Sequence, residues 1–149
     1  MGLRPHPRLG TIEVRICDAQ TRIDSVAAIV ALVQSLAATL ADRYGREGSL
    51  PVQPITLVSE NKWRATRYGL DADLIWLERD EERPAREALR HLVELAEPAA
   101  GRLGCAAELA LVEEVLRRGT GADEQRRIHA EGESLLAVAQ FLSTSTTEG

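Results

Sequence analysis

The chain has 149 residues, a length that fits one domain, and its hydrophobic content of 44% is enough for a core. Only 3% of the residues are aromatic, so this core must be built from Ala, Leu, Val and Ile. The formal net charge of −5 argues against nonspecific binding to nucleic acid or to an anionic membrane surface.

The N-terminal residues do not resemble a secretory leader, because Arg4, His6 and Arg8 precede a polar strand and not an apolar segment. The longest apolar run, residues 26–33, is too short to span a membrane. Two distant cysteines without metal-type spacing favour buried thiols in a reducing compartment. We therefore expect a cytoplasmic protein that binds neither nucleic acid nor membrane.

Residues 11–17 alternate between apolar and polar side chains, which predicts a β-strand. Burying its three branched apolar residues is worth about 2 kcal/mol each, whereas fixing each backbone residue costs about 1–2 kcal/mol. Such a strand cannot stand alone, and the sequence hardly supplies neighbours for it. We therefore expect self-association or pairing with a companion chain through residues 11–17. The three apolar residues on one face are Ile12, Val14 and Ile16.

After this strand, apolar periodicity predicts five or six helices. The first, ended by Gly45, is apolar enough to be buried on most sides. Pro98 should end the third, and Leu109, Val112, Leu116 and the preceding Ala106 mark the core face of the fourth. The predicted helices cover about 24–44, 55–68, 84–97, 105–118, 123–130 and 134–142.

Between the second and third helices, residues 70–77 are expected to be extended and residues 79–83 to form a charged linker. The sequence thus predicts a single α+β unit, largely helical, with one firm N-terminal strand. Its parts are the strand and its approach (1–18), the helical part (24–142) and a frayed tail (143–149).

Glu13 and Arg15 point to the same side of the predicted strand, about 7 Å apart. A carboxylate in this position can bind a hard cation, and a guanidinium group can hold a phosphate or a carboxylate. The alternative is a cross-strand salt bridge on a solvated face of a sheet.

Two further stretches carry polar groups in suggestive positions. Lys62, Arg64 and Arg67 can bind anions, and Asn61 shares a helix face with Arg64; the alternative is a solvated helix. In residues 118–125, a glycine pair before a helix can present amides to a phosphate, but the Lys-Ser/Thr pair of a P-loop is missing. The alternative there is the end of one helix followed by the start of the next.

Four motifs follow one another in the chain: RPHPRLGTIEVRICDA (4–19), ENKWRA (60–65), RYGLDA (67–72) and RGTGAD (118–123). In this order they resemble the C-terminal part of the type 2 glutamate–cysteine ligases, also called carboxylate-amine ligases. The resemblance covers nearly the whole chain. It implies a catalytic fold like that of glutamine synthetase, in which a curved antiparallel sheet holds ATP, magnesium and the acid substrate.

The family reaction phosphorylates the side-chain carboxylate of glutamate with ATP, and the amine of cysteine or another amino compound then attacks the acyl phosphate. The resemblance implies that Glu13 is a magnesium ligand. It implies that Arg15 is the catalytic clamp on the substrate carboxylate or the transferred phosphoryl group. It also implies substrate or phosphate binding by four residues of the second and third motifs: Asn61, Lys62, Arg64 and Arg67.

Members of this family are more than twice as long, and their N-terminal part, with most of the sheet, has no counterpart in these 149 residues. The resemblance therefore implies a fragment, one half of a split enzyme or a degenerate paralogue. We expect the lone chain to be inactive and to need a companion chain that supplies the missing sheet. The alternative is a noncatalytic helical interaction or regulatory module descended from the family.

Overall fold

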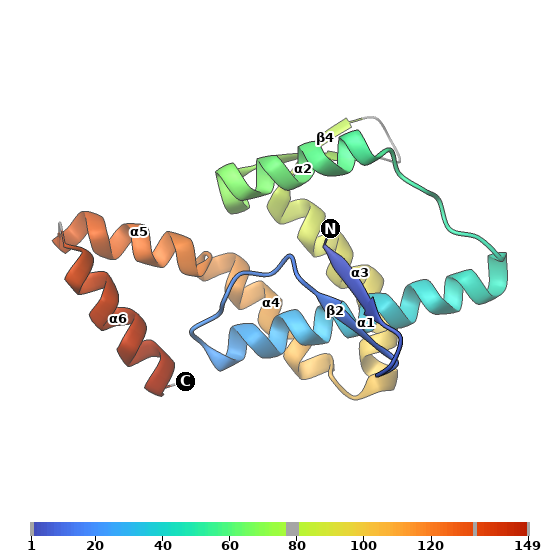
Figure 1. Cartoon of the computed structure of the whole chain (residues 1–149), viewed down its shortest axis with the longest axis horizontal. Helices are drawn as coiled ribbons and strands as arrows, with labels where there is room; N and C mark the ends of the chain where they lie inside the picture. The colour runs from blue at the N-terminus through green and yellow to red at the C-terminus, as the bar shows by residue number, and fades with distance from the viewer. Residues whose placement is uncertain (1, 77–80, 133, 149) are drawn as a thin grey trace.

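The computed structural model describes residues 2–76, 81–132 and 134–148. Within these ranges it contains six α-helices, a short 3₁₀ helix and two separate two-stranded antiparallel sheets (Figure 1), which confirms the predicted α+β class. The elements are β1 (Leu3–His6), β2 (Thr11–Val14), α1 (Ile23–Glu47), α2 (Ile55–Tyr68), η1 (Gly69–Asp71), β3 (Asp73–Trp76), β4 (Glu81–Pro84), α3 (Ala85–Leu103), α4 (Ala106–Arg118), α5 (Gly121–Gly132) and α6 (Leu135–Glu148).

The core lies where α1 packs against α3 and α4. The buried residues of α1 and α3 are small, so the helix axes can approach closely. The predicted core face of α4 is confirmed for its three larger residues, whereas Ala106 is exposed. The buried residues are Ser25, Ala28, Ala31 and Ser35 on α1, Ala85, Ala88, Ala96, Ala99 and Ala100 on α3, and Leu109, Val112 and Leu116 on α4.

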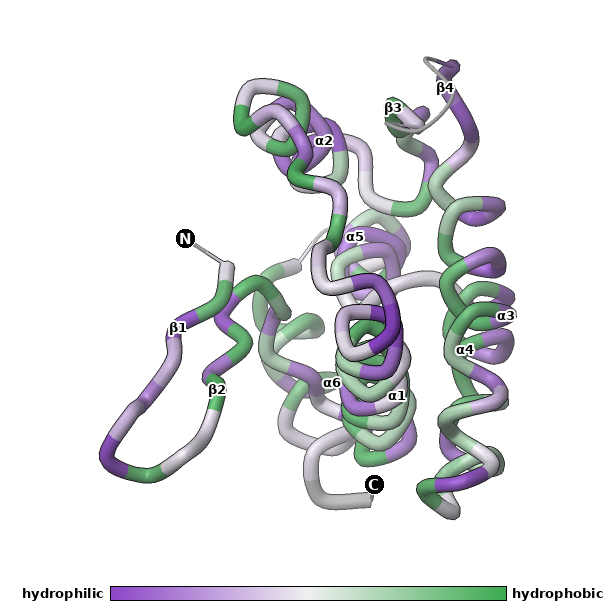
Figure 2. The backbone as a smooth tube through the Cα atoms, turned by 90° about the vertical axis from the view of Figure 1, so that its right-hand side faces the viewer, coloured by the Kyte–Doolittle hydropathy of each residue, from purple (hydrophilic) through white to green (hydrophobic). Residues whose placement is uncertain are grey.

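The prediction that α1 is buried on most sides is wrong. Figure 2 shows α3 and α4 along one side of α1 and the β1–β2 hairpin beyond the other. Ile23 is 63% exposed and Val30 is 55% exposed, because only the stripe of small residues faces α3 and α4. By length and hydropathy α1 could cross a bilayer, although the core helix of a soluble protein passes the same test.

Two predicted helix ends are corrected. α1 continues through Gly45 to Glu47 and ends before Gly48, whose φ of 72° is the left-handed conformation typical of a helix terminator. α3 continues through Pro98 to Leu103. A proline inside a helix costs about 3 kcal/mol, and the burial of the two alanines that follow Pro98 offsets part of this cost. The predicted bounds of α2 are confirmed.

The last two helices are longer than predicted. α5 begins at Gly121, two residues before the predicted cap Asp123. The Ser134 hydroxyl accepts a hydrogen bond of 3.1 Å from the Leu136 amide, as expected of a helix cap. We expected residues 143–149 to fray, yet α6 continues to Glu148, and the Thr146 hydroxyl donates to the Leu142 carbonyl at 2.8 Å.

The predicted strand 11–17 is shortened to β2, and it has a neighbour that the sequence interpretation missed. β1, predicted only as an extended approach, pairs with β2 antiparallel, with Leu3 opposite Val14 and Pro5 opposite Ile12. A proline is tolerated there because β1 is an edge strand. Among the described residues, the other edge of β2 carries no strand.

The second hairpin corrects the predicted linker. Residues 81–83 belong to β4, which pairs with β3, so that Leu74 lies opposite Arg83. The expected extended stretch 70–77 begins as the 3₁₀ helix and becomes β3 only at Asp73. The predictions for residues 77, 79 and 80 lie outside the described residues.

Candidate functional site

The β1–β2 hairpin brings Glu13 between two arginines. Its Oε2 lies 3.6 Å from Nη1 of Arg4 across the hairpin, and its Oε1 lies 3.4 Å from Nε of Arg15, the residue that follows β2. All three side chains are about half exposed. This geometry is the salt bridge on a solvated face that the sequence left open. A cation at Glu13 would compete with both guanidinium groups for the carboxylate oxygens.

The described residues do not complete a magnesium site by themselves. Within them, no group of three or more His, Cys, Asp or Glu side chains is placed to hold a metal ion. Magnesium is octahedral and usually keeps several waters besides one or two carboxylates and substrate phosphates. Glu13 could therefore supply only one ligand of such a site.

Asn61 and Arg64 attach α2 to the second hairpin. The Asn61 amide donates to the Ile75 carbonyl at 2.8 Å and accepts from the Ile75 amide at 2.7 Å. Arg64 lies 2.8 Å from a carboxylate oxygen of Glu60 and 2.7 Å from one of Glu82. Hydrogen bonds to these two acids, the Glu60 bond first, raise the pKa of Arg64. Both predicted site residues thus have structural partners.

Arg67 lies on a different face of α2 from Lys62. Its guanidinium carbon is 5.5 Å from the centre of the Tyr68 ring, which in turn meets Trp63 edge to face at 5.8 Å. Lys62, in contrast, lines a cavity beside α2. Of the four predicted anion-binding residues, only Asn61 and Lys62 line this cavity.

The cavity has a volume of about 850 Å³ and lies between residues 16–22, α2 and the α4–α5 junction. It therefore brings together parts of the first, second and fourth motifs. Ile29, Val58 and Val115 give it an apolar lining, and polar side chains line it as well. Small-molecule sites have volumes of about 300–1,000 Å³. The cavity is large enough for a substrate or a cofactor fragment.

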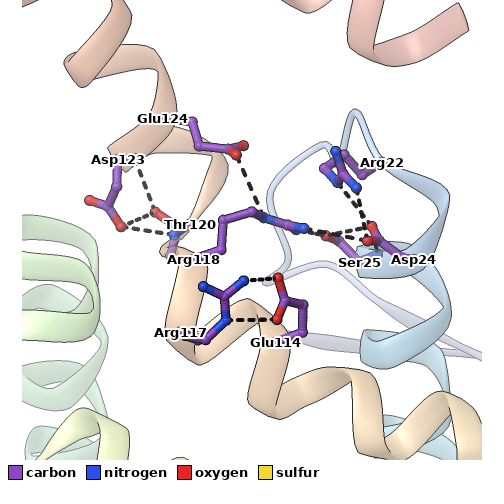
Figure 3. A network of polar contacts seen from close by, with 9 residues as sticks. All are labelled: Arg22, Asp24, Ser25, Glu114, Arg117, Arg118, Thr120, Asp123 and Glu124. Atoms are coloured by element: carbon purple, nitrogen blue, oxygen red, sulfur yellow. Dashed lines mark hydrogen bonds and ion pairs between the residues drawn. The ribbon is translucent and has the colours of Figure 1, made fainter. Parts of the chain in front are cut away.

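Arg118, at the end of α4, joins three elements at one wall of the cavity (Figure 3). Its Nη1 lies 3.3 Å from Asp24, its Nη2 donates to the Ser25 hydroxyl at 2.8 Å, and its Nε lies 3.6 Å from Glu124. Only 18% of the Arg118 side chain is exposed. Sequence reasoning missed this network, because Arg118 and Asp24 lie 94 positions apart in the chain and leave no local pattern.

Asp24 is held as an anion within this network. Burial acts to raise the pKa of its carboxyl group, but hydrogen bonds from Arg22 and from the Ser25 amide, with the charges of Arg22 and Arg118, lower it on balance. Asp24 also lies in the first turn of α1, where the helix dipole favours a negative charge. The start of α1 is thus fixed to α4 by a charged contact.

The glycine-containing stretch 118–125 forms a helix junction. The amide and the hydroxyl of Thr120 both donate to Oδ2 of Asp123 at 2.8 Å, and the Asp123 amide donates to the Thr120 hydroxyl at 3.3 Å. Burial opposes ionisation of Asp123, yet the hydrogen bonds from Thr120, aided by Arg126, lower its pKa. This reciprocal capping is the helix-end interpretation that the sequence had left open.

Comparison with known proteins gives consistent results. The family model described as glutamate-cysteine ligase family 2 matches residues 2–140. "Putative glutamate--cysteine ligase 2-1" of Arthrobacter sp. (strain FB24) is 44% identical over 99% of this chain and 39% of its own length. "Putative glutamate--cysteine ligase 2-3" of Rubrobacter xylanophilus is 45% identical over 97% of this chain and 38% of its own. A relative from Sorangium cellulosum is 40% identical, with 99% and 39% covered. The chain spans less than half the length of these relatives.

Proposed function

The chain belongs to glutamate–cysteine ligase family 2, and we propose that it is part of an ATP-dependent carboxylate-amine ligase that acts together with a companion polypeptide. The observation that carries this proposal is the match to the Arthrobacter relative. The two proteins are 44% identical over 99% of this chain, but the matched region is only 39% of the relative. The proposed reaction also needs the part of the relatives that this chain does not match, and the proposal assigns that part to the companion.

The proposed reaction joins glutamate to an amino compound such as cysteine. Transfer of the ATP γ-phosphoryl group to the glutamate side-chain carboxylate gives ADP and an acyl phosphate. Attack by the amine then forms the amide, with loss of phosphate and a proton. Magnesium and guanidinium groups would offset the negative charge that develops during phosphoryl transfer.

In this proposal the hairpin supplies two of the reacting site's groups. Arg15 is half exposed and presents a planar guanidinium fork to a carboxylate or a phosphoryl group, a geometry that favours two parallel hydrogen bonds. Glu13 supplies one magnesium ligand, and the companion and the substrate supply the others. Asn61 and Arg64 contribute by holding α2 on the second hairpin.

The companion would join at the open edge of β2. Leu3 and Ile12, on the two strands of the hairpin, are 57% and 67% exposed, and an unpaired strand edge is a template for a further strand. A second copy of this chain is the alternative occupant of that edge. We place the assembly in the cytoplasm, bound to neither nucleic acid nor membrane.

The test is to reconstitute the missing part. The chain is co-produced with the segment of the Arthrobacter relative that it does not cover, and phosphate release is measured with ATP, magnesium, glutamate and cysteine. We expect release that depends on both amino acids from the pair and none from the lone chain. Activity from the lone chain would contradict the requirement for a companion.

Two substitutions locate the chemistry in the reconstituted pair. Glu13→Gln should weaken the magnesium dependence, and Arg15→Lys should reduce turnover strongly, because an ammonium group cannot reproduce a bidentate fork. Arg43→Lys is the matched control, since Arg43 pairs with Glu47 at the far end of α1. Equal effects of Arg15→Lys and Arg43→Lys would exclude a catalytic role for Arg15.

A second candidate is a noncatalytic interaction or regulatory module. It is favoured by the contacts of Glu13, Asn61 and Arg64, which are all engaged within the chain. A reconstituted pair that associates and folds but releases no phosphate would support this candidate against the ligase.

A further inference from the structure

We propose that the cavity between α2 and the α4–α5 junction binds a phosphate or carboxylate group, with Lys62 as its principal cation. This site lies apart from Glu13 and Arg15, which do not line the cavity. The inference rests on the cavity and not on turnover, so it extends the proposed function by a second anion site without depending on it.

Lys62 is the cation of the cavity that has no ion-pair partner in the described chain. The other three lining cations are neutralised by nearby carboxylates. Arg22 lies 3.2 Å from Asp24. Arg118 lies 3.3 Å from that same carboxylate, and Arg126 lies 2.8 Å from Asp123. An anion entering the cavity can therefore pair with Lys62 without breaking an existing ion pair.

The face of α2 that lines the cavity favours an anion at Lys62. Val58, Ala65 and Gly69 lie three, four or seven residues from Lys62 and so share its side of the helix. This wall contains no acidic residue. Lys62 is exposed, so its ammonium group is accessible to an anion that enters the cavity. Thr66, one turn along the helix, adds a hydroxyl at the wall.

The opposite wall adds further donors. Nε of Arg118 is buried without a hydrogen-bond acceptor in the described chain. A carboxylate oxygen of Glu124 lies 3.6 Å from this Nε atom. Arg126 uses Nη1 for Asp123 and keeps a side chain that is 67% exposed. Four cations and two acids, Asp18 and Glu124, line the cavity. Asp24 and Asp123 offset three of these cations from outside the lining, which leaves Lys62 as the cation without an ion pair among the described residues.

The size and lining of the cavity indicate the kind of ligand. Its volume of about 850 Å³ exceeds the needs of a bare ion, and its apolar lining can hold the organic part of a molecule. The shared chemistry is a phosphate or carboxylate group on a small molecule. A nucleotide and an acidic amino acid both offer such a group, and binding measurements can separate them.

The chain offers a specific reporter, because Lys62 is its only lysine. Reductive methylation with ¹³C-formaldehyde keeps the positive charge and gives one lysine NMR signal besides that of the N-terminal amine. The methylated full chain is titrated separately with inorganic phosphate, glutamate, ATP without magnesium, and sodium chloride at matched ionic strength. We expect a saturable shift of the Lys62 signal with at least one of the first three and only a small, non-saturating shift with chloride.

A matched control moves the reporter to another face of the same helix. In the double variant Lys62→Arg with Arg67→Lys, the charge of the chain is unchanged and the single lysine leaves the cavity. Its signal should not saturate with any of the ligands. Saturation at both positions, or a chloride-like response at Lys62, would overturn the proposal.

Equilibrium dialysis supplies an independent measurement. Lys62→Gln should weaken the binding of the saturating ligand about tenfold, as expected for the loss of one charge-assisted hydrogen bond, whereas Arg43→Gln should not change it. Unchanged affinity in Lys62→Gln would contradict the proposal.

Saturation by phosphate and ATP alone would identify a nucleotide phosphate, and saturation by glutamate alone would identify a carboxylate. Both readouts use the lone chain, so failure of ligase turnover would leave them intact.

Discussion

The core of α1, α3 and α4 and the β1–β2 hairpin use apolar residues in opposite ways. In the core, Ala31 and Leu109 are each 2% exposed and Ala96 is fully buried, because each helix finds two partners within the chain. In the hairpin, Ile12 is 67% exposed and Leu3 is 57% exposed, and among the described residues each strand pairs with one other strand only. Within the described residues, the chain thus forms a packed helical core, whereas the β1–β2 hairpin remains a two-stranded sheet with exposed apolar side chains.

The largest effect on stability should come from truncating the core. Leu109→Ala should lower the free energy of unfolding by about 2–5 kcal/mol, since it removes a buried side chain and leaves a cavity among helices that already pack closely. Ile12→Ala, the matched truncation in the hairpin, should change it by less than about 0.5 kcal/mol. Urea unfolding followed by circular dichroism measures both. Equal costs would mean that the hairpin is as well packed as the core.

The next effect concerns the contact between Arg118 and the start of α1. Arg118→Gln should cost about 1–3 kcal/mol, because it removes the guanidinium group that pairs with Asp24 and donates to the Ser25 hydroxyl at a largely buried junction. Arg117→Gln is the control, since the Arg117 side chain is 72% exposed and its ion pair with Glu114 is screened by solvent. Chemical unfolding of the two variants compares them. A cost for Arg117→Gln as large as that for Arg118→Gln would contradict a stabilising role for the contacts of Arg118 with Asp24 and Ser25.

A smaller effect depends on pH. The pKa of Asp24 in the folded chain lies below its ordinary value of 3.8, so its stabilising contribution is complete above pH 3.8 and is lost as the pH falls through the folded value. The difference in unfolding free energy between the parent chain and Asp24→Asn should therefore be largest near neutral pH and shrink below pH 3.8. Urea titrations at several pH values measure this difference. If this difference in unfolding free energy grew as the pH fell, the pKa of Asp24 would be raised in the folded chain and not lowered.

The smallest effect on stability should accompany a large effect on assembly. Ile12→Lys places a charge on the exposed hairpin and should leave the unfolding free energy nearly unchanged. It should, however, reduce association through the open strand edge, as lysines on edge strands do in natural sheets. Size-exclusion chromatography with light scattering measures the mass of both chains. A parent chain that stays monomeric at micromolar concentration would exclude self-association.

Helices with strong local signals were predictable from the sequence. Ser134 before an apolar run predicts the start of α6, and the spacing of Leu109, Val112 and Leu116 predicts the buried face of α4. The errors in the predicted elements arise where residues distant in the sequence determine the local structure. β1 contains Pro5, which hides a strand from propensity rules, and α3 continues past Pro98 into a turn whose Ala99 and Ala100 are buried.

The candidate site was likewise predictable only where its residues are close in the sequence. The period of two in a strand is enough to place Glu13 beside Arg15. Nothing local distinguishes Lys62, which lines the cavity, from Arg64, which is held by Glu60 and Glu82. The pairing of Arg118 with Asp24 joins two helix ends that are distant in the chain and needs the three-dimensional structure.

The central claim, a complete core beside an incomplete sheet, is tested most directly by hydrogen exchange. Amide exchange in residues 11–14 and in residues 109–116 is compared in the lone chain and after addition of the segment of the Arthrobacter relative that this chain does not cover. The account predicts protected amides in 109–116 under both conditions, and exchange in 11–14 that slows about tenfold or more only with the companion. Hairpin amides as protected as those of α4 in the lone chain, or unchanged by the companion, would contradict it.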